Sequence, residues 1–205
     1  MANFIITIDG PSGSGKSTIC KMLAKSDGFI HIDTGKIYRS IAYLLGETFN
    51  QDELNKLKLD FKLQDSQVLL IHNDKVLNDL LSTEDIAKKA SLIAQKEFVR
   101  NFVNNFARKI AHDGKFIIDG RDAGSIIFAN AQLKFFLTAR IQERAKRRSK
   151  ELSIDYKKSL NSIIQRDKND SQRSIAPLVV PKGAITIDTT NLTIEEVYGL
   201  IKSYL

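Results

Sequence analysis

The sequence has few of the features that hold small or extracellular proteins together. It contains one cysteine among 205 residues, so no intrachain disulfide can form. Three prolines and eleven glycines are too few for a disordered or collagen-like chain. No apolar run approaches the ~20 residues that cross a bilayer, and residues 1–4 lack the basic start of a signal peptide. These absences lead us to expect a soluble, cytoplasmic protein with no membrane partner.

Signatures of several function classes are also missing. The three histidines, His31, His72 and His112, share no metal-ligand spacing, which favours structural roles for them. We expect Cys20 to be a small buried apolar residue in a helix. The Asn-Lys-x-Asp sequence that reads guanine is absent, and so is an RNA-binding signature with interleaved aromatic residues.

The composition is that of one globular domain. The chain is 42% hydrophobic and 27% charged, and its length corresponds to one catalytic-sized domain. A formal net charge of +7 indicates affinity for anions, which include nucleic acid, a membrane surface and small phosphorylated substrates. The positions of the arginines must distinguish among these.

Apolar periodicity predicts alternating strands and helices. Short β-branched or aromatic runs predict buried strands, and repeats of three and four residues predict helices. Strands are expected at residues 4–8, 29–32, 116–118, 135–137 and 185–187. Helices are expected at residues 16–28, 37–45, 98–110 and 193–201. The opening strand–helix–strand–helix order favours a parallel sheet covered by helices on both faces.

Residues 51–81 interrupt this alternation. Apolar runs at residues 68–72 and 75–77 are separated by Asn73 and Asp74, a pair typical of a two-residue hairpin turn. We therefore expect a small β-containing insertion here. The long helix at residues 98–110 is expected to bury one face, because Phe98, Phe102, Phe106 and Ile110 recur every four residues.

Residues 10–17, GPSGSGKS, match the phosphate-binding loop G-x-x-x-x-G-K-[ST] at every fixed position, between a predicted strand and a predicted helix. In such a loop, backbone N–H groups and the positive end of the helix converge on phosphate oxygens. Lys16 adds a point charge, and the Ser17 hydroxyl suits Mg²⁺. The predicted ATP-binding residues here are Gly10, Pro11, Ser12, Gly13, Ser14, Gly15, Lys16, Ser17 and Thr18. GTPases, ATPase motors and small-molecule kinases share this loop, and the short chain with its late arginines favours a small kinase.

Three further motifs follow in order: DTGKIYR at residues 33–39, DGRDAG at residues 119–124, and a set comprising Arg166-Asp167, Asp170, Arg173 and residues 176–178. With the phosphate-binding loop, they make the chain resemble the bacterial cytidylate kinases over essentially its whole length. The resemblance implies an α/β P-loop NTPase fold of three layers, with a parallel sheet flanked by helices. It also implies a single kinase domain of three parts. These are a core (about 1–36, 84–140 and 176–205), a monophosphate-binding insert (about 37–83, with an adjoining helix to 100) and a lid (about 141–172).

The resemblance further implies transfer of the ATP γ-phosphoryl group to CMP or dCMP, in line and with Mg²⁺. We expect a monomer because the sequence shows no exposed apolar heptad seam. We expect no nucleic-acid partner because the late cations are interrupted by motifs that suit a lid. Residues that match the family's acceptor site are Asp33, Thr34, Tyr38, Arg39, Ser91, Arg100, Arg121, Asp122, Arg166, Asp170 and Arg173. Arg39 and Arg121 would hold the acceptor phosphate, because guanidinium groups bind dianions in a bidentate manner. Ser91, Arg100 and Asp122 match the residues that read cytosine, where a carboxylate accepts a hydrogen bond from the exocyclic amino group.

The implied catalytic residues are Lys16, Arg121, Arg144 and Arg148, and Arg147 is expected on ATP. Arg144, Arg147 and Arg148 would belong to the lid and neutralise charge on the transferring group. Asp119 ends a predicted strand, where it suits either the magnesium shell or a turn.

Two other functions stay open from the residues alone. One is a kinase of another acceptor, such as UMP, AMP, shikimate or gluconate. The other is a nucleic-acid-binding protein that uses the positive charge.

Overall fold

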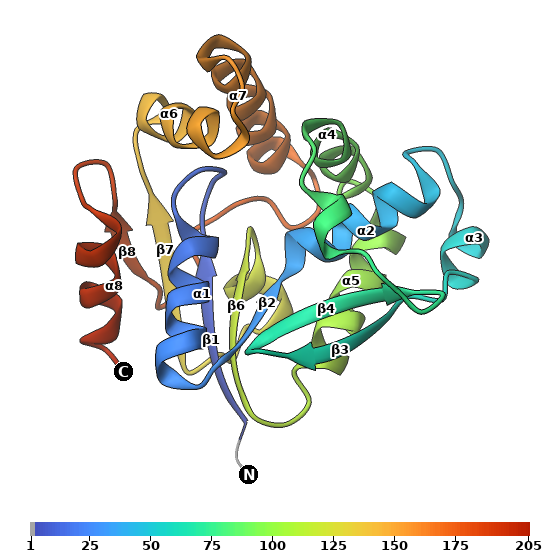
Figure 1. Cartoon of the computed structure of the whole chain (residues 1–205), viewed down its shortest axis with the longest axis horizontal. Coiled ribbons are helices and arrows are strands. Elements are labelled where there is room, and N and C mark those ends of the chain that lie inside the picture. Colours follow the sequence, from blue (N-terminus) through green and yellow to red (C-terminus); the bar gives the residue numbers. More distant parts are fainter. Residues whose placement is uncertain (1–2) are drawn as a thin grey trace.

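The computed structural model describes residues 3–205 and contains one central sheet with helices on both faces (Figure 1). The strands are β1 (Phe4–Asp9), β2 (Ile30–Asp33), β3 (Asp60–Gln64), β4 (Gln67–His72), β5 (Lys75–Val76), β6 (Lys115–Gly120), β7 (Leu133–Thr138) and β8 (Ile185–Asp188). The α-helices are α1 (Lys16–Asp27), α2 (Thr34–Leu45), α3 (Gln51–Asn55), α4 (Glu84–Ile93), α5 (Glu97–Ile110), α6 (Ile141–Leu152), α7 (Tyr156–Gln172) and α8 (Ile194–Lys202). A 3₁₀ turn, η1, covers Asn78–Leu81, and a π-helical turn, η2, covers Ala123–Ile127.

The strand order is β3-β4-β2-β6-β1-β7-β8, and β5 pairs with β4. All neighbours from β4 to β8 along this order are parallel, whereas β3 and β5 run antiparallel to β4. Parallel strands are buried on both faces, which explains their continuous apolar runs. In β6, Phe116 and Ile118 contribute to one core and Ile117 to the other. The predicted three-layer α/β fold is confirmed.

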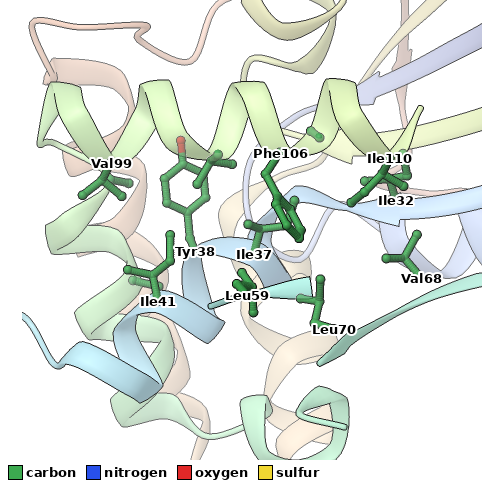
Figure 2. Packing of buried hydrophobic residues seen from close by; sticks show 14 of the residues in the cluster. Ile32, Ile37, Tyr38, Ile41, Leu59, Val68, Leu70, Val99, Phe106 and Ile110 are labelled. Atoms are coloured by element: carbon green, nitrogen blue, oxygen red, sulfur yellow. The ribbon is translucent and has the colours of Figure 1, made fainter. Parts of the chain in front are cut away.

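The two faces of the sheet carry separate hydrophobic cores. On one face, Ile19 and Leu23 of α1 pack in the same core as Val197 and Ile201 of α8. The opposite core includes α2 and α5, and Figure 2 shows residues of both helices within it.

The buried face of α5 differs from the expected phenylalanine stripe. Its buried apolar residues are Val99, Val103, Phe106, Ala107 and Ile110, whereas Phe98 and Phe102 are only partly buried. The repeat of 3.6 residues per turn explains the difference, because a strict four-residue spacing drifts around the helix.

The predicted insertion extends the main sheet instead of standing apart from it. The expected hairpin is present as β4–β5, and a second hairpin, β3–β4, precedes it. In the β3–β4 hairpin, the turn residues Asp65 and Ser66 have φ of 50° and 60°. In the β4–β5 hairpin, Asn73 and Asp74 have φ of 47° and 61°. Two consecutive residues with positive φ match the type I′ turn that fits the twist of paired strands. Strand β3 was not expected because its sequence, DFKLQ, is mostly exposed and contains no apolar run.

Within residues 3–205, the structure contains no helix that is both long and apolar enough to cross a membrane.

Candidate active site

A cavity of about 280 Å³ lies at the carboxyl ends of β1, β2 and β6, where open α/β sheets bind their ligands. Its walls come from the loop before α1, from α2, α4 and the loop after β6, and from α6 and α7. The predicted site residues that line it are Ser12, Gly13, Gly15, Lys16, Ser17, Thr18, Asp33, Thr34, Tyr38, Arg39, Ser91, Asp119, Arg121, Asp122, Arg148, Arg166, Asp170 and Arg173. Six predicted residues do not line it: Gly10, Pro11, Ser14, Arg100, Arg144 and Arg147.

The loop between β1 and α1 folds tightly because its glycines permit it. Gly10 has φ of 146°, and a Cβ there would lie 2.0 Å from the Leu137 carbonyl oxygen. Gly13 has φ of 76°, and its Cβ would lie 2.8 Å from the Arg144 carbonyl oxygen. A side chain at either position would therefore push the loop away from its neighbours.

Lys16 begins α1 and is buried beneath this loop. Its Nζ donates to the Pro11 carbonyl oxygen at 2.8 Å and to Ser14 Oγ at 3.4 Å. Burial, reinforced by the nearby Arg121 guanidinium, lowers the pKa of Lys16 to about 7. Among residues 3–205, no carboxylate lies within ion-pair distance of Lys16 Nζ, so an anionic ligand in the cavity would satisfy this ammonium group.

Asp9, the last residue of β1, was not among the predicted site residues. Its carboxylate is fully buried and accepts hydrogen bonds from the backbone N–H groups of Ala123, at 2.8 Å, and Gly124, at 2.7 Å. Burial raises the pKa of Asp9 to about 6 against the opposing effect of those two bonds. Asp9 thus ties the phosphate-binding loop to the segment that carries Arg121 and Asp122.

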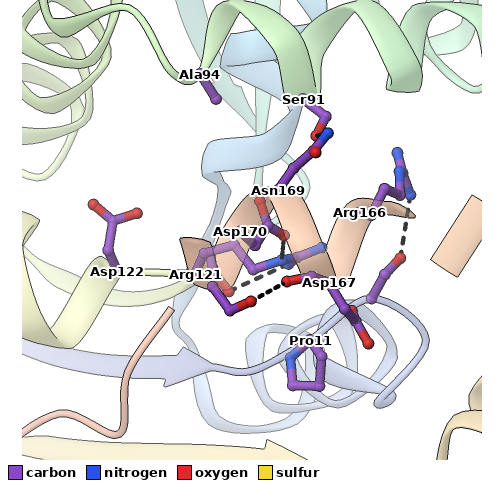
Figure 3. Close-up of polar contacts among 12 residues, drawn as sticks. Pro11, Ser91, Ala94, Arg121, Asp122, Arg166, Asp167, Asn169 and Asp170 are labelled. Atoms are coloured by element: carbon purple, nitrogen blue, oxygen red, sulfur yellow. Dashed lines mark hydrogen bonds and ion pairs between the residues drawn. The ribbon is translucent and has the colours of Figure 1, made fainter. Parts of the chain in front are cut away.

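Arginines and aspartates alternate in a cluster at the other end of the cavity. Arg100 pairs with Asp122, and Arg173 Nη2 lies 3.6 Å from the other Asp122 oxygen. Arg121 Nε lies 2.8 Å from Asp170 Oδ2, and Arg173 Nη1 lies 3.7 Å from Asp170 Oδ1. Figure 3 shows that Arg121 and Asp122 come from the loop after β6, whereas Asp170 comes from α7. Segments far apart in the sequence therefore share one charge network.

The pair of Arg100 and Asp122 is the most deeply buried part of this cluster, with side chains 2% and 5% exposed. Arg100 also donates to the Ala94 carbonyl oxygen at 3.2 Å and lies 5.9 Å from the centre of the Tyr38 ring. Burial raises the pKa of the Tyr38 hydroxyl above its ordinary value. Arg100 does not reach the cavity, and it orients Asp122, which does.

Asp33 and Arg39 form an ion pair at the wall of the cavity, beside the phosphate-binding loop. The Asp33 carboxylate caps α2 by accepting from the Lys36 N–H at 3.0 Å, and its second oxygen lies 2.9 Å from Arg39 Nη2. Burial opposes ionisation, but Arg39, together with His31 and Lys36, lowers the pKa of Asp33 to about 2. Asp33 therefore stays ionised and holds Arg39 toward the cavity. Thr34 Oγ1 donates to the Asp119 carbonyl oxygen at 2.9 Å.

The arginines of α6 divide between the cavity and the core. Arg148 lines the cavity and pairs with Glu84 of α4 at 2.6 Å. Arg144 donates to the carbonyl oxygens of Ala139 at 2.9 Å and Ser12 at 3.2 Å. It also pairs with Asp167 at 2.7 Å, so it fastens α6 and α7 to the phosphate-binding loop.

Arg147 contacts the segment after β8. Its Nη1 donates to Thr189 Oγ1 at 2.9 Å and its Nη2 to the Thr189 carbonyl oxygen at 2.6 Å. In this structure, Arg147 therefore attaches α6 to the core and lies outside the cavity.

Two further residues of α7 make contacts at the cavity, which Arg166 lines. Arg166 donates to Ser12 Oγ at 3.2 Å, and burial lowers the pKa of Arg166 to about 10, with help from Arg148 and Arg121. Asn169 donates to Ser91 Oγ of α4 at 3.4 Å, and Figure 3 shows these two side chains next to each other. These contacts join the helices on opposite sides of the cavity.

Comparison with known proteins decides which family this arrangement represents. A family model described as cytidylate kinase matches residues 6–205. The chain belongs to the cytidylate kinase family. A cytidylate kinase of Fusobacterium nucleatum is 41% identical over 98% of this chain and 96% of its own length. One from Chlamydia trachomatis is 38% identical over 98% and 99%, respectively.

Solved structures agree on the fold at much lower identity. A crystal structure of an uncharacterized protein from Eubacterium ventriosum has a TM-score of 0.53 and 18% identity, covering 99% of this chain and 98% of that one. A shikimate kinase from Bacteroides thetaiotaomicron has a TM-score of 0.50 and 13% identity, covering 98% and 97%. The cytidylate kinase relatives carry the family assignment, and these two structures support the P-loop kinase fold alone.

Several residues of this cytidylate kinase family member lie at the site without having been predicted there. Asp9, Glu84 and Asp167 each bind a predicted site residue or its segment. Asp9 directly precedes the phosphate-binding loop, which was the available signal. Glu84 gives no such signal, because an acidic residue in the first turn of a helix is explained by the helix dipole. Cys20, His31 and Asp119 also meet, although the spacing of the histidines suggested no such grouping.

Proposed function

We propose that this protein transfers the γ-phosphoryl group of ATP to CMP or dCMP, yielding ADP and CDP or dCDP. One observation supports the proposal above all others. A single cavity has the phosphate-binding loop on one side and the buried Arg100–Asp122–Arg173 cluster on the other. The phosphate-binding loop suits a nucleoside triphosphate, and the buried cluster suits a small polar base. Membership of the cytidylate kinase family supports the same substrates.

The acceptor base would meet the Asp122 carboxylate. A carboxylate accepts a hydrogen bond from the exocyclic amino group of cytosine and repels the carbonyl that uracil has there. Arg100 orients Asp122 through a buried ion pair. Ser91 and Arg173, which also line the cavity, would bound the base.

The acceptor sugar and phosphate would occupy the space between Asp170 and Asp33. Asp170 and Arg166 are within reach of the ribose, and Arg39 and Arg121 would hold the phosphate. Both arginines are held by a carboxylate, Arg39 by Asp33 and Arg121 by Asp170. Guanidinium groups fixed in this way bind a phosphate in a bidentate manner with little further loss of rotamer freedom.

The residues at the donor side suit Mg²⁺. The Ser17 hydroxyl and the Asp119 carboxylate both line the cavity, and oxygen donors are the ligands that Mg²⁺ prefers. We propose that Ser17 binds the ion and that Asp119 supports its water shell. Bound Mg²⁺ neutralises charge on the β- and γ-phosphates.

The chemistry requires no general base. An oxygen of the acceptor phosphate, already ionised near neutral pH, forms a bond to the γ-phosphorus as the bond to the β-phosphate oxygen breaks. Lys16, Arg121 and Arg148 line the cavity and would stabilise the charge of the transferring group. Arg144 would act indirectly, by positioning the phosphate-binding loop through its hydrogen bond to the Ser12 carbonyl oxygen. Arg147 would reach ATP only if it released Thr189.

We further propose that the three parts act as core, acceptor insert and lid, with the boundaries given above. The bonds of Glu84 to Arg148 and of Ser91 to Asn169 already span the cavity between α4 and the lid helices. Closure over both substrates would exclude water that otherwise hydrolyses ATP. The monomeric state, the cytoplasmic location and the absence of a nucleic-acid partner stay predictions.

A coupled assay of ADP release tests the function. Mg-ATP is supplied with CMP, dCMP, UMP, AMP, GMP or no acceptor, side by side. Selective turnover of CMP and dCMP is the expected result. Another acceptor used tenfold better than either would contradict the base assignment, and ATP hydrolysis independent of acceptor would contradict the kinase mechanism.

A further inference from the structure

Three buried side chains with different ligand chemistry meet behind the phosphate-binding loop. Cys20 comes from α1, His31 from β2 and Asp119 from β6, and their ligand atoms all lie within 4.8 Å of one another. The residues are 0%, 5% and 6% exposed. The proposed phosphoryl transfer uses neither Cys20 nor His31.

The geometry of the cluster is close to that of a transition-metal site. His31 Nε2 and Asp119 Oδ1 are 2.9 Å apart. Around a tetrahedral Zn²⁺, bond lengths of ~2.0 Å to nitrogen and oxygen and ~2.3 Å to sulfur separate the ligand atoms by about 3.3–3.6 Å. The His31–Asp119 pair needs to open by a few tenths of an ångström, and Cys20 Sγ needs to approach by up to about 1.3 Å. Side-chain rotations can supply both movements.

The cluster lies between two cavities of the described residues. Asp119 lines the main cavity, and His31 lines a second one of about 10 Å³, together with Lys36 and Gln67 among others. A space of this size holds about one water molecule. An ion that enters the main cavity therefore reaches Asp119 without unfolding of the sheet.

We propose that Cys20 Sγ, His31 Nε2 and Asp119 Oδ1 bind one borderline-soft divalent ion, typified by Zn²⁺, at a site distinct from that of the Mg²⁺ of ATP. A thiolate and an imidazole select Zn²⁺ over Mg²⁺, which prefers oxygen ligands alone. On binding, the Cys20 thiol proton leaves to solvent, and the proton of neutral His31 resides on Nδ1. Because the ion engages Asp119, its binding also inhibits phosphoryl transfer, a consequence that rests on the proposed function.

Binding is measured on the full chain without nucleotide, because ATP chelates metal ions. Cd²⁺ is the probe, since its thiolate complex has an ultraviolet charge-transfer absorption. We expect one equivalent to produce this absorption in the unmodified protein, and Cys20→Ala and Cys20→Ser to abolish it. His31→Gln should weaken Cd²⁺ binding at least tenfold, the scale of a lost metal-site interaction, whereas His72→Gln, at a distant histidine, should not change it. Circular dichroism checks that each variant folds.

Either of two results would overturn the site. One is calorimetric affinity for Zn²⁺ that is unchanged by Cys20→Ala. The other is a charge-transfer absorption of full strength and affinity in His31→Gln, which would indicate a lone reactive thiol.

Inhibition is then measured with buffered free Zn²⁺ and CMP as acceptor. Cys20→Ala should keep the basal turnover and need at least tenfold more Zn²⁺ for half-inhibition. Equal inhibition of both proteins would refute the inhibitory role. Failure of the proposed function would appear as absent CMP turnover with the cadmium absorption intact, so the two failures are distinguishable.

Discussion

The donor and acceptor sides of the cavity are built in different ways. The donor side is formed mainly by the backbone of one continuous loop, residues 10–17, followed by a helix. The acceptor side is formed by side chains from α2, α4, α7 and the loop after β6. Arginines and aspartates there pair with one another, and Arg100 of α5 supports Asp122 from behind the cavity wall. A loop depends on local conformation, whereas a side-chain network depends on the whole fold. Loss of one charge should therefore lower the free energy of unfolding at the acceptor side but not at the donor side.

The largest expected effect on activity is at the donor side. Lys16→Met should lower kcat by 10²–10³-fold or about 3–4 kcal/mol, as loss of one transition-state charge contact does. Its free energy of unfolding at pH 7 should not fall, because burial of the ammonium group already lowers the pKa of Lys16 to about 7. Kinetic assays and urea unfolding measure the two quantities. Lys25→Met, at an exposed position of the same helix, is the control that should change neither.

At the acceptor side, loss of the Asp122 charge should reduce both the activity with CMP and the free energy of unfolding. Asp122→Asn should lower kcat/KM for CMP strongly with little change in the KM for ATP. The unfolding free energy should fall by about 3–5 kcal/mol, because Arg100 is left buried without its carboxylate. Steady-state kinetics with each substrate varied in turn, together with urea unfolding, measure these effects. Equal losses for CMP and ATP would mean that Asp122 supports the fold and does not read the base.

A double variant separates the two roles of Asp122. Replacing both partners, as Arg100→Met with Asp122→Leu, removes the uncompensated charge and should restore much of the stability. It should not restore use of CMP. Recovery of CMP turnover in the double variant would contradict direct recognition of the base by Asp122.

The same contrast explains how much could be read from the sequence. The position of the loop at residues 10–17, between a strand and a helix, was predicted correctly, because a fixed spacing identifies such a loop. The role of Arg100 as a partner of Asp122 was not derivable from spacing, since the two residues lie on different elements and meet only through packing. Arg144 and Arg147 looked equivalent to Arg148 in the sequence, yet the rotation of α6 turns them toward Ser12 and Thr189. Strand β3 was missed because its sequence, DFKLQ, is mostly exposed and contains no apolar run.

The pH dependence of stability sharpens the comparison through Asp9, which connects the two sides. The pKa of Asp9 is raised from 3.8 to about 6. Between these pH values, Asp9 keeps its proton in the folded protein but has lost it in the unfolded chain. The contribution of protonated Asp9 is thus fully present below pH 3.8 and is lost as the pH rises through 6. As the pH rises from below 3.8 to above 6, ionisation of Asp9 should lower the free energy of unfolding by about 3 kcal/mol. Relative to the unmodified protein, Asp9→Asn should therefore become more stable by this amount between pH 4 and pH 7, as measured by urea unfolding at each pH. A difference that does not vary with pH would contradict the raised pKa.

The smallest expected effect distinguishes two neighbouring arginines of the lid. Arg148 lines the cavity and Arg147 does not, although they are adjacent on α6 and carry the same charge. Arg148→Ala should lower kcat by 10–100-fold, since it removes a guanidinium group from the transferring phosphoryl group. Arg147→Ala should leave kcat within a factor of about three and lower the unfolding free energy by about 1–3 kcal/mol, because it removes two hydrogen bonds to Thr189. Single-turnover kinetics and thermal unfolding of both variants provide the measurement. If Arg147→Ala lost as much kcat as Arg148→Ala, then α6 would have to rotate on closure and release Thr189, and the lid would be a catalytic element assembled only when both substrates are bound.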